Sequence, residues 1–425
     1  MSLERVIAKT AAETTLAAQF AALRSAAPSV QREAAFRRFE QSGLPTRRVE
    51  SWHYTDLRAA LVSAAPIAAA PAAAAIEAAR GMLASLARIG ASRVALVDGH
   101  YVAALSDAPP SGVAIFPVTP DTPPLGDADP VLALNVALAQ GGCALTFEAG
   151  ADAPLVEIVH IFTPGAEAVY SRLAITLGAA AQAKVVERFV GAGAQAQRNV
   201  STWIDVAKDA KASHVVSIED EAGVHVESQV VSLAEGAALD AFGLIAGGAL
   251  ARRQIFATLA GERARIGLGG LSLVDGRRHA DTTLEVIHAA PNGESREFYR
   301  HIVADEGVGV YQGKVIVRQY AQKTDGGMKS QAILLSPNAS MNNKPELEIL
   351  ADDVVCGHGA TVGALDPEQI FYLQARGLPR REAEAMVLEA FGAEAIARVA
   401  DPKIDEVLSG AMRAWLARRA GMEST

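Results

Sequence analysis

The chain has 425 residues, of which 50% are hydrophobic and 20% charged, a composition that is ordinary for a globular protein and excludes wholesale disorder. Its net charge of -9 argues against a general nucleic-acid-binding protein, which normally carries a basic surface. The two cysteines, Cys143 and Cys356, lie far apart and outside any CxxC pair, which excludes a self-contained zinc or four-thiolate cluster site.

Residues 1–130 are predicted to form a mainly helical region with one short hairpin. Leu16, Phe20 and Leu23 recur with helical spacing, and Asp98-Gly99 between two apolar runs predicts a two-residue turn. The proline-rich residues 109–130 are predicted to be a boundary or an ordered crossing loop. The N-terminus lacks a continuous apolar stretch and no segment is apolar enough to span a membrane. We therefore expect a cytoplasmic protein with neither a signal peptide nor a membrane or nucleic-acid partner.

Residues 131–365 have the texture of a mainly β core. Short apolar runs alternate with Gly, Asp and Ala turns. Leu177 and Leu233 each precede an alanine by four residues, at Ala181 and Ala237. An imperfect repeat of short strands and small-residue turns predicts a solenoid or β-helix. A large sandwich is the alternative, although the length of this region without a helix counts against it.

Residues 366–425 are predicted to be a small helical domain. Asp366 and Pro367 supply a helix N-cap and a first helical residue. The next helix has an apolar face with the spacing i, i+3, i+4, i+7 and i+8. Its members are Ala383, Met386, Val387, Ala390 and Phe391. A partner surface is one candidate for what covers this face.

The sequence contains no nucleophile elbow, Walker loop or dinucleotide fingerprint. The glycine-rich residues 267–270 and 307–313 are predicted to be turns between strands rather than phosphate-binding loops. Asp352 and Asp353 are adjacent, so on a strand they point to opposite faces and cannot act as a glycosidase pair. Glu297, Tyr299, Arg300 and His301 follow the pattern of a half-exposed strand and are predicted to lie at the surface or an interface.

Cys356 and His358 are the strongest candidates for chemistry. They are two residues apart within VCGHG, so a strand would place both side chains on one face. The neighbouring glycines leave access for another chain or a ligand. A thiolate and an imidazole suit iron or zinc, but they make half a site, whose remaining ligands would come from another subunit. The alternative is a small buried cysteine and a surface histidine beside a turn.

Longer segments resemble a known family. The segments FYRHIVADEGVGVYQGKVIVRQYAQ and LEILADDVVCGHGATVG resemble the SufB/SufD family, the β-helical subunits of the Suf iron–sulfur cluster assembly machine. The segment GLPTRRVESWHYTDL resembles the W-[KR]-Y-T-x-L signature of the SufD branch. Ser330 stands where the SufB pattern has a cysteine, and His358-Gly359 replaces its His-Glu. The resemblance is therefore to the SufD branch rather than to the SufB scaffold.

The resemblance implies a right-handed parallel β-helix core with an N-terminal helical region and a small C-terminal helical domain. It implies a non-catalytic subunit that pairs with SufB through the β-helices and docks the SufC ATPase on residues 366–425, through the face from Ala383 to Phe391. His358 would lie at the SufB–SufD interface beside iron or a transient iron–sulfur cluster, with Cys356 as the weaker candidate. Reduced FAD is implied for the complex, whereas ATP would be bound by SufC and not by this chain.

Other functions remain open at this point. A β-helical polysaccharide lyase or hydrolase would need a secretion signal, an aromatic-lined groove and facing carboxylates, and the sequence offers no convincing example of these. A SufB-type scaffold subunit is a second alternative, against which Ser330 argues. A homodimer acting without partners is a third, and nothing in the sequence excludes it.

Overall fold

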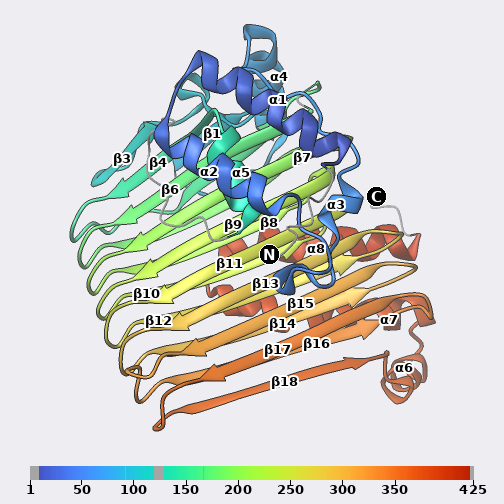
Figure 1. Ribbon diagram of the computed structural model, residues 1–425. Coiled ribbons are helices and arrows are strands. Elements are labelled where there is room, and N and C mark those ends of the chain that lie inside the picture. The colour runs from blue at the N-terminus through green and yellow to red at the C-terminus, as the bar shows by residue number, and fades with distance from the viewer. Residues whose placement is uncertain (1–8, 91, 119–128, 166, 422–425) are drawn as a thin grey trace, which may run out of the picture.

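The computed structural model describes residues 9–90, 92–118, 129–165 and 167–421. Its core is a parallel β-helix whose strands alternate between two facing sheets, called sheet I and sheet II below (Figure 1). Sheet I contains β1 (Ser92–Val97), β5 (Val156–Phe162), the first half of β7 (Gln182–Val206), β8 (Lys211–Ile218), β10 (Ala238–Ile245), β12 (Arg265–Val274), β14 (Glu294–Val303), β16 (Asp325–Leu334) and β18 (Val355–Gly363). Sheet II contains β3 (Val113–Pro117), β4 (Gly141–Phe147), β6 (Ala168–Leu177), the second half of β7, β9 (Glu221–Leu233), β11 (Leu250–Leu259), β13 (His279–His288), β15 (Val308–Val317) and β17 (Ser340–Ile349).

The predicted mainly β core is confirmed, and the sandwich alternative is wrong. From β4 onward the sheet pairings are parallel, and from β8 to β18 each strand pairs with the strand two positions further along the chain. A sandwich of hairpins would instead pair neighbouring strands in antiparallel fashion. The chain therefore coils, and each coil adds one rung to both sheets.

The coils turn at one corner with the same backbone conformation, which accounts for the small-residue repeat. One residue at each of these turns has a left-handed positive φ, at Ala180 (58°), Asp209 (58°), Gly236 (66°), Arg263 (57°), Asn292 (60°) and Lys323 (62°). The N–H of Asp209, for example, donates to the carbonyl of Glu235 in the next coil at 2.9 Å. The alanines that follow, at Ala181, Ala210, Ala237 and Ala264, are fully buried in the core. Small side chains fit because neighbouring rungs lie only about 4.8 Å apart.

Most helices of the N-terminal region cover the outer face of sheet II (Figure 1). The helical elements before β4 are α1 (Ala11–Ala26), α2 (Val30–Ser42), η1 (Glu50–Trp52), α3 (Leu57–Ala60), α4 (Ala73–Ser85), η2 (Ala103–Leu105) and α5 (Pro130–Leu138). In this layer Phe20 of α1 stacks on Phe36 of α2 with ring centroids 4.0 Å apart. Both helices pack with α5, which is buried against sheet II beside Trp203.

A buried polar cluster attaches this helical layer to sheet II. Trp52 is fully buried, and its Nε1 donates to Asp129 at 2.8 Å. The Arg252 guanidinium lies 3.8 Å from the centre of the Trp52 ring system and forms an ion pair with Asp281. Asp281 also accepts a hydrogen bond from Thr55. The WHYT motif therefore has a structural role, because two of its four residues hold the N-terminal region against the β-helix.

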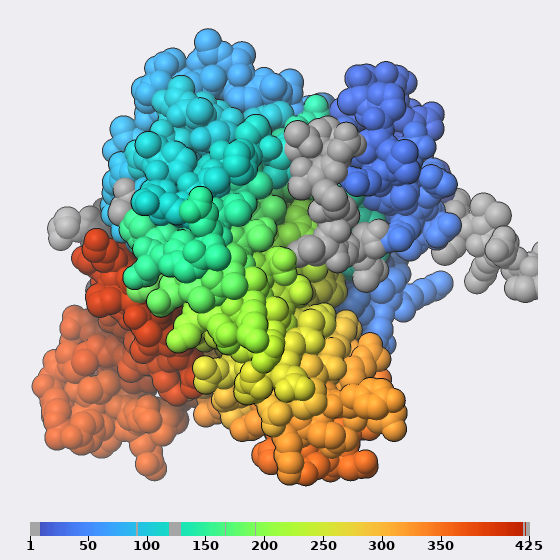
Figure 2. All heavy atoms as spheres, turned by 90° about the vertical axis from the view of Figure 1, so that its left-hand side faces the viewer, coloured from blue at the N-terminus to red at the C-terminus, as the bar shows by residue number. Residues whose placement is uncertain are grey.

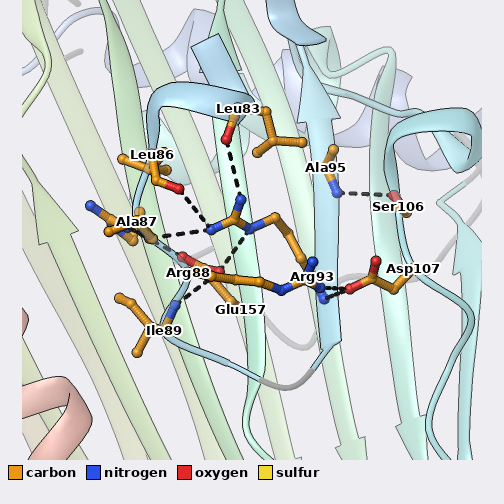
Figure 3. A network of polar contacts seen from close by, with 11 residues as sticks. Leu83, Leu86, Ala87, Arg88, Ile89, Arg93, Ala95, Ser106, Asp107 and Glu157 are labelled. Atoms are coloured by element: carbon orange, nitrogen blue, oxygen red, sulfur yellow. Dashed lines mark hydrogen bonds and ion pairs between the residues drawn. The ribbon is translucent and has the colours of Figure 1, made fainter. Parts of the chain in front are cut away.

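Helix α4 instead covers the outer face of sheet I beside its first strands. Arg93 on β1 reaches under the C-terminal end of α4, where it donates to the carbonyls of Leu83 (3.3 Å), Leu86 (3.3 Å) and Ala87 (3.2 Å) (Figure 3). Its Nε also pairs with Glu157 on β5 at 2.8 Å. One buried guanidinium thus satisfies carbonyl groups that the end of a helix leaves without intrahelical partners.

The start of the β-helix differs from the boundary expected at residue 131. β1 and β2 (His100–Tyr101) form the predicted antiparallel hairpin, with positive φ at Asp98 (49°) and Gly99 (85°). However, β1 also pairs in parallel with β5, so sheet I begins at residue 92. The apolar run of β1 pairs with both β2 and β5, and only its hairpin with β2 has a local sequence signal, the Asp98-Gly99 turn. Within the proline-rich segment, β3 is a strand, and residues 119–128 lie outside the described residues.

The C-terminal helices α6 (Pro367–Gln374), α7 (Arg380–Ile396), η3 (Ala397–Val399) and α8 (Pro402–Ala420) follow the last strand. Asp366 caps α6 and Pro367 begins it, as predicted. Helices α7 and α8 pack on the outer face of sheet I, where Leu388 and Trp415 join its buried apolar side chains. None of the helices in the described ranges is both long enough and apolar enough to cross a membrane.

The two ends of the β-helix differ in exposure. In the first coil, Val94, Leu96 and Leu145 point into the core and have no exposed surface. At the other end, β18 pairs with β16 alone in sheet I within the described part of the chain, and nearly all of its residues are exposed (Figure 1). The β-helix is therefore closed at its N-terminal end and open at its C-terminal end.

Candidate functional site

The open end of the β-helix, formed by β17 and β18, carries Cys356 and His358. In the pairing of β18 with β16, Cys356 lies opposite Gly326 and His358 lies opposite Met328. Met328 is a buried member of the interior core. Because side chains alternate between the two faces of a strand, Cys356 and His358 lie on the interior face of the last rung. Both candidate side chains therefore lie at the open C-terminal end of the β-helix.

Cys356 and His358 have different surroundings. His358 is exposed, whereas Cys356 is partly covered and packs against the core. The absence of a side chain at Gly326 makes room for it, because a Cβ there would lie 3.3 Å from the Cys356 Sγ. Burial raises the pKa of the Cys356 thiol above its ordinary value of 9.0. The sulfur is therefore a protonated thiol at neutral pH until a metal ion or a base removes its proton.

Cys356 and His358 do not form a complete metal site. Across the ranges that the structure describes, no group of three or more His, Cys, Asp and Glu side chains is arranged to hold a metal ion. Ser330, one coil below on β16, is fully buried and donates to Asn343 Oδ1 at 2.6 Å. A hydroxyl is a poor substitute for a thiol as a sulfur acceptor or soft ligand. A metal ion bound at this end would therefore need further ligands from another molecule.

The β-helix interior also contains a buried polar network that the sequence analysis missed. Glu187 bonds to His160 Nε2 at 2.8 Å and to His214 Nε2 at 2.7 Å. Gln229 continues the chain by donating to His214 Nδ1 at 2.7 Å and accepting from Arg253 at 3.0 Å. Burial opposes ionisation of Glu187, but the two histidines outweigh it and hold the pKa of this carboxyl well below its usual value. These residues lie on strands that are neighbours in space but 15 or more residues apart in sequence, so no local motif reveals the network.

Glu297 and its neighbours lie in the same interior, which contradicts the prediction that they are at the surface. Glu297, Tyr299 and His301 are each no more than 2% exposed. Glu297 lies opposite Met328 on β16, which in turn lies opposite His358. Glu297, Tyr299 and His301 do share one face of β14, as their spacing predicts, but that face points into the β-helix and not to the surface. Burial raises the pKa of Glu297 to about 8, against the smaller lowering effects of nearby polar and charged groups.

We expect Glu297→Gln to change the pH dependence of stability. In the unfolded chain the pKa of this carboxyl is near its ordinary value of 4.5, whereas in the folded chain its pKa is about 8. Ionisation thus favours the unfolded state increasingly between these two pH values. The variant lacks this penalty and should gain stability relative to the natural chain by roughly 3–5 kcal/mol over that range. Urea unfolding at pH 5 and pH 8 tests this, with Glu306→Gln, an exposed change, as the control. Parallel curves for all three proteins would contradict it.

The face of α7 predicted to dock a partner lines an open groove. The groove has a volume of about 590 Å³ and lies between α6, α7 and the end of sheet I. Met386, Val387, Ala390 and Phe391 line it, and Met386 is 50% exposed. Ala383 is fully buried and is not one of the lining residues. Four of the five predicted residues therefore share one accessible apolar surface.

Comparison with known proteins gives a consistent picture. Residues 160–391 match the family model of the SUF system FeS cluster assembly SufBD core domain, and residues 17–119 match that of the SufBD protein N-terminal region. The iron–sulfur cluster assembly protein SufD of Escherichia coli is 32% identical over 365 residues, which cover 83% of this chain and 85% of that protein. The chloroplastic protein ABCI7 of Arabidopsis thaliana is 31% identical over 224 residues, 52% of this chain and 47% of that protein.

A further relative is a mycobacterial protein. An iron–sulfur cluster assembly SufBD family protein of Mycobacterium tuberculosis is 29% identical over 285 residues, covering 64% of this chain and 71% of its own length. The core model alone spans more than half of the chain, and it includes the strands that carry Ser330, Cys356 and His358. The chain therefore belongs to the SufB/SufD family of Suf-system iron–sulfur cluster assembly proteins and, within it, is SufD-like.

Proposed function

We propose that this chain is a non-catalytic, cytoplasmic subunit of the Suf iron–sulfur cluster assembly complex, which pairs with SufB at its open end and with SufC at its C-terminal helices. The observation that carries the proposal is the open end itself. Strand β18 leaves Cys356 and His358 accessible beside an unpaired sheet edge. Native proteins normally cover or block such edges, so an exposed one is suited to pairing with another chain.

The apolar surface of the open end supports pairing with a second protein. Val355 is 71% exposed, Leu350 is 50% exposed and Val362 is 48% exposed. These side chains lie on or next to the last strand, and burying them against another β-helix would remove apolar area from water. The open end of a SufB β-helix is the partner that best fits this edge, because it would continue the same rungs.

The chemistry of the open end follows from its two side chains. Iron or a nascent cluster is cargo at this interface, held for a time and then passed on. His358 would supply a neutral imidazole ligand, and Cys356 would supply a thiolate once its proton is lost. SufB would provide the remaining ligands, because this chain alone has too few. The hydrolysis of ATP would take place on SufC, and the present chain would transmit the resulting movement through its C-terminal helices.

Co-expression with SufB and SufC of the same organism tests the proposal. We expect affinity purification through a tag on this chain to recover one assembly whose mass accounts for all three proteins. Recovery of this chain alone, as a monomer or homodimer, in the presence of both partners would overturn the proposed role. The chain would then be interpreted as a β-helical protein that binds or catalyses without these partners.

The groove along α7 gives a separate prediction for SufC. We expect Met386→Glu to weaken retention of SufC by about tenfold or more, because a charge would be buried in an apolar contact. SufB should remain bound, since the open end is unchanged. Ala414→Glu places the same charge at an exposed position of α8 and serves as the control. Equal SufC recovery with both variants would show that SufC docks elsewhere.

A further inference from the structure

The two sheets of the β-helix end in strands with different free edges. The last strand of sheet I is β18 and the last strand of sheet II is β17, and in the described part of the chain each pairs with a strand on one side only. We call the unpaired side of β18 the sheet I edge and that of β17 the sheet II edge. Figure 2 shows this end of the molecule in orange, at the bottom, with the C-terminal helices on its sheet I side and the N-terminal region above it on its sheet II side.

The sheet I edge offers an uninterrupted row of main-chain groups. The N–H of Val355 donates to the carbonyl of Thr324 at 2.9 Å, so the main-chain groups of the odd-numbered residues of β18 face β16. Consecutive residues of a parallel strand direct these groups to opposite sides, so the even-numbered residues face the free edge. They are Cys356, His358, Ala360 and Val362. β18 contains no proline and no Asp, Glu, Lys or Arg, so this edge is open to the addition of a strand.

The sheet II edge is interrupted near its centre. The N–H of Ser340 donates to the carbonyl of Gly307 at 3.0 Å, so the even-numbered residues of β17 face β15 and the odd-numbered ones face the free edge. Pro345 is one of the odd-numbered residues and has no N–H to donate there. Lys344 and Glu346 place charged side chains on either side of it. Proline and lysine are residues with which proteins protect an edge from pairing.

The interruption faces His358 across the open end. Pro345 lies in register with Gly313 on β15, and His358 lies in register with Met328 on β16. A Cβ at Gly313 would collide with the Met328 sulfur, so these two positions face each other across the interior. One coil further on, Pro345 and His358 therefore face each other as well. The edge that cannot be continued is thus the one from which His358 can be reached.

We propose that the β-helix of SufB is joined to this chain by main-chain hydrogen bonds along the sheet I edge alone, whereas the sheet II edge remains an unpaired seam. This inference rests on the proposed function, because it describes the geometry of the same joint. β18 is then a hinge, and the seam is the way by which cargo reaches His358. The α7 groove lies on the sheet I side of the hinge. A pull on the C-terminal helices turns the two β-helices about β18 and widens the seam, because the pull and the seam are on opposite sides of the hinge.

Hydrogen exchange measured by mass spectrometry on the purified complex with SufB tests which edge is paired. We expect the edge-facing amides of β18 to exchange at least about tenfold more slowly in the complex than in the free chain, because they gain hydrogen bonds. The edge-facing amides of β17 should exchange at the same rate in both. Equal protection of the two strands, or protection of β17 alone, would overturn the proposal. Recovery of the complex is scored separately, so a failure of the proposed function is distinguished from a failure of this inference.

The accessibility of the Cys356 thiol tests the seam. We expect binding of SufB to slow the alkylation of Cys356 by iodoacetamide at least about tenfold less than it slows exchange of the edge-facing amides of β18, because the seam opens while the sheet I pairing holds. Cys143 has no exposed surface and should stay unmodified, so its alkylation would report unfolding. Equal slowing of alkylation and exchange would show that access requires separation of the whole joint, and would overturn the seam.

Matched proline substitutions locate the hinge. Ala360→Pro removes one edge-facing N–H from β18, and we expect it to weaken retention of SufB by about tenfold or more. Ile349→Pro removes an edge-facing N–H from β17 at a residue that is 41% exposed, and should leave retention unchanged. Ala360→Val alters the side chain but keeps the N–H, and should also retain SufB. Equal loss with Ala360→Pro and either control would overturn the assignment, and the exchange measurement on the unaltered chain does not depend on how these variants fold.

Discussion

Replacing His358 with alanine is expected to reduce cluster accumulation on the assembled complex to background, while the complex itself still forms. His358 is an exposed side chain on an edge strand and supports no buried contact, so its removal should cost little stability. It does remove one of the two side chains, Cys356 and His358, that the interior face of β18 offers as soft or borderline metal ligands. The measurement is the visible absorbance and the iron and sulfide content of the purified complex after anaerobic reconstitution.

Two variants separate this effect from a general disturbance. His53→Ala removes another exposed histidine, in the N-terminal region, and should leave cluster accumulation unchanged. Cys356→Ser keeps His358 and tests the weaker candidate, and a partial loss is expected there. Normal cluster content in the His358→Ala complex would show that this histidine is not needed for cluster assembly.

Asp281→Ala is expected to cause the largest loss of stability among the changes considered. It leaves the fully buried Arg252 guanidinium without its carboxylate and removes the acceptor of the Thr55 hydroxyl. Removal of one partner from a buried ion pair typically costs about 3–5 kcal/mol. The free energy of unfolding should fall by that amount, measured by urea denaturation with tryptophan fluorescence, since Trp52 belongs to the same cluster.

Two further variants test whether the loss of stability in Asp281→Ala comes from the unpaired buried charge of Arg252. Asp353→Ala also removes a carboxylate from an ion pair, but Asp353 and Lys323 are both more than 60% exposed, so little change is expected. Combining Arg252→Met with Asp281→Leu removes both charges and should restore most of the lost stability. If the double variant is as unstable as Asp281→Ala, the loss comes from packing rather than from an unpaired charge.

Patterns that repeat along the chain were predictable. The small alanines at each corner, the short apolar runs and the Asp98-Gly99 turn are local features, and the structure confirms a parallel β-helix with one hairpin at its start. The cap formed by Asp366 and Pro367 is equally local. Such features depend on residues a few positions apart, which is the range over which backbone preference acts.

The direction in which polar side chains point was not predictable. Alternation shows that Glu297, Tyr299 and His301 share a face, but polarity suggested the outer one, and the structure places them inside. The reason is that their partners come from other coils, far away in sequence. The prediction that residues 267–270 and 307–313 are turns is also wrong, because residues 267–270 lie within β12 and residues 308–313 within β15, where pairing with strands of other coils outweighs the local turn preference of glycine.

By itself, the sequence determined the class of the fold, the family, and the pair Cys356 and His358 as the candidate ligands, because each rests on residues close together in the chain. The tertiary structure decided that this pair stands at the open mouth of the last coil. It also decided that four of the five residues of the α7 face stay accessible, and that Glu297, Tyr299 and His301 lie in the interior of the β-helix. These are consequences of coiling, which brings residues about 27 to 31 positions apart into register on neighbouring rungs.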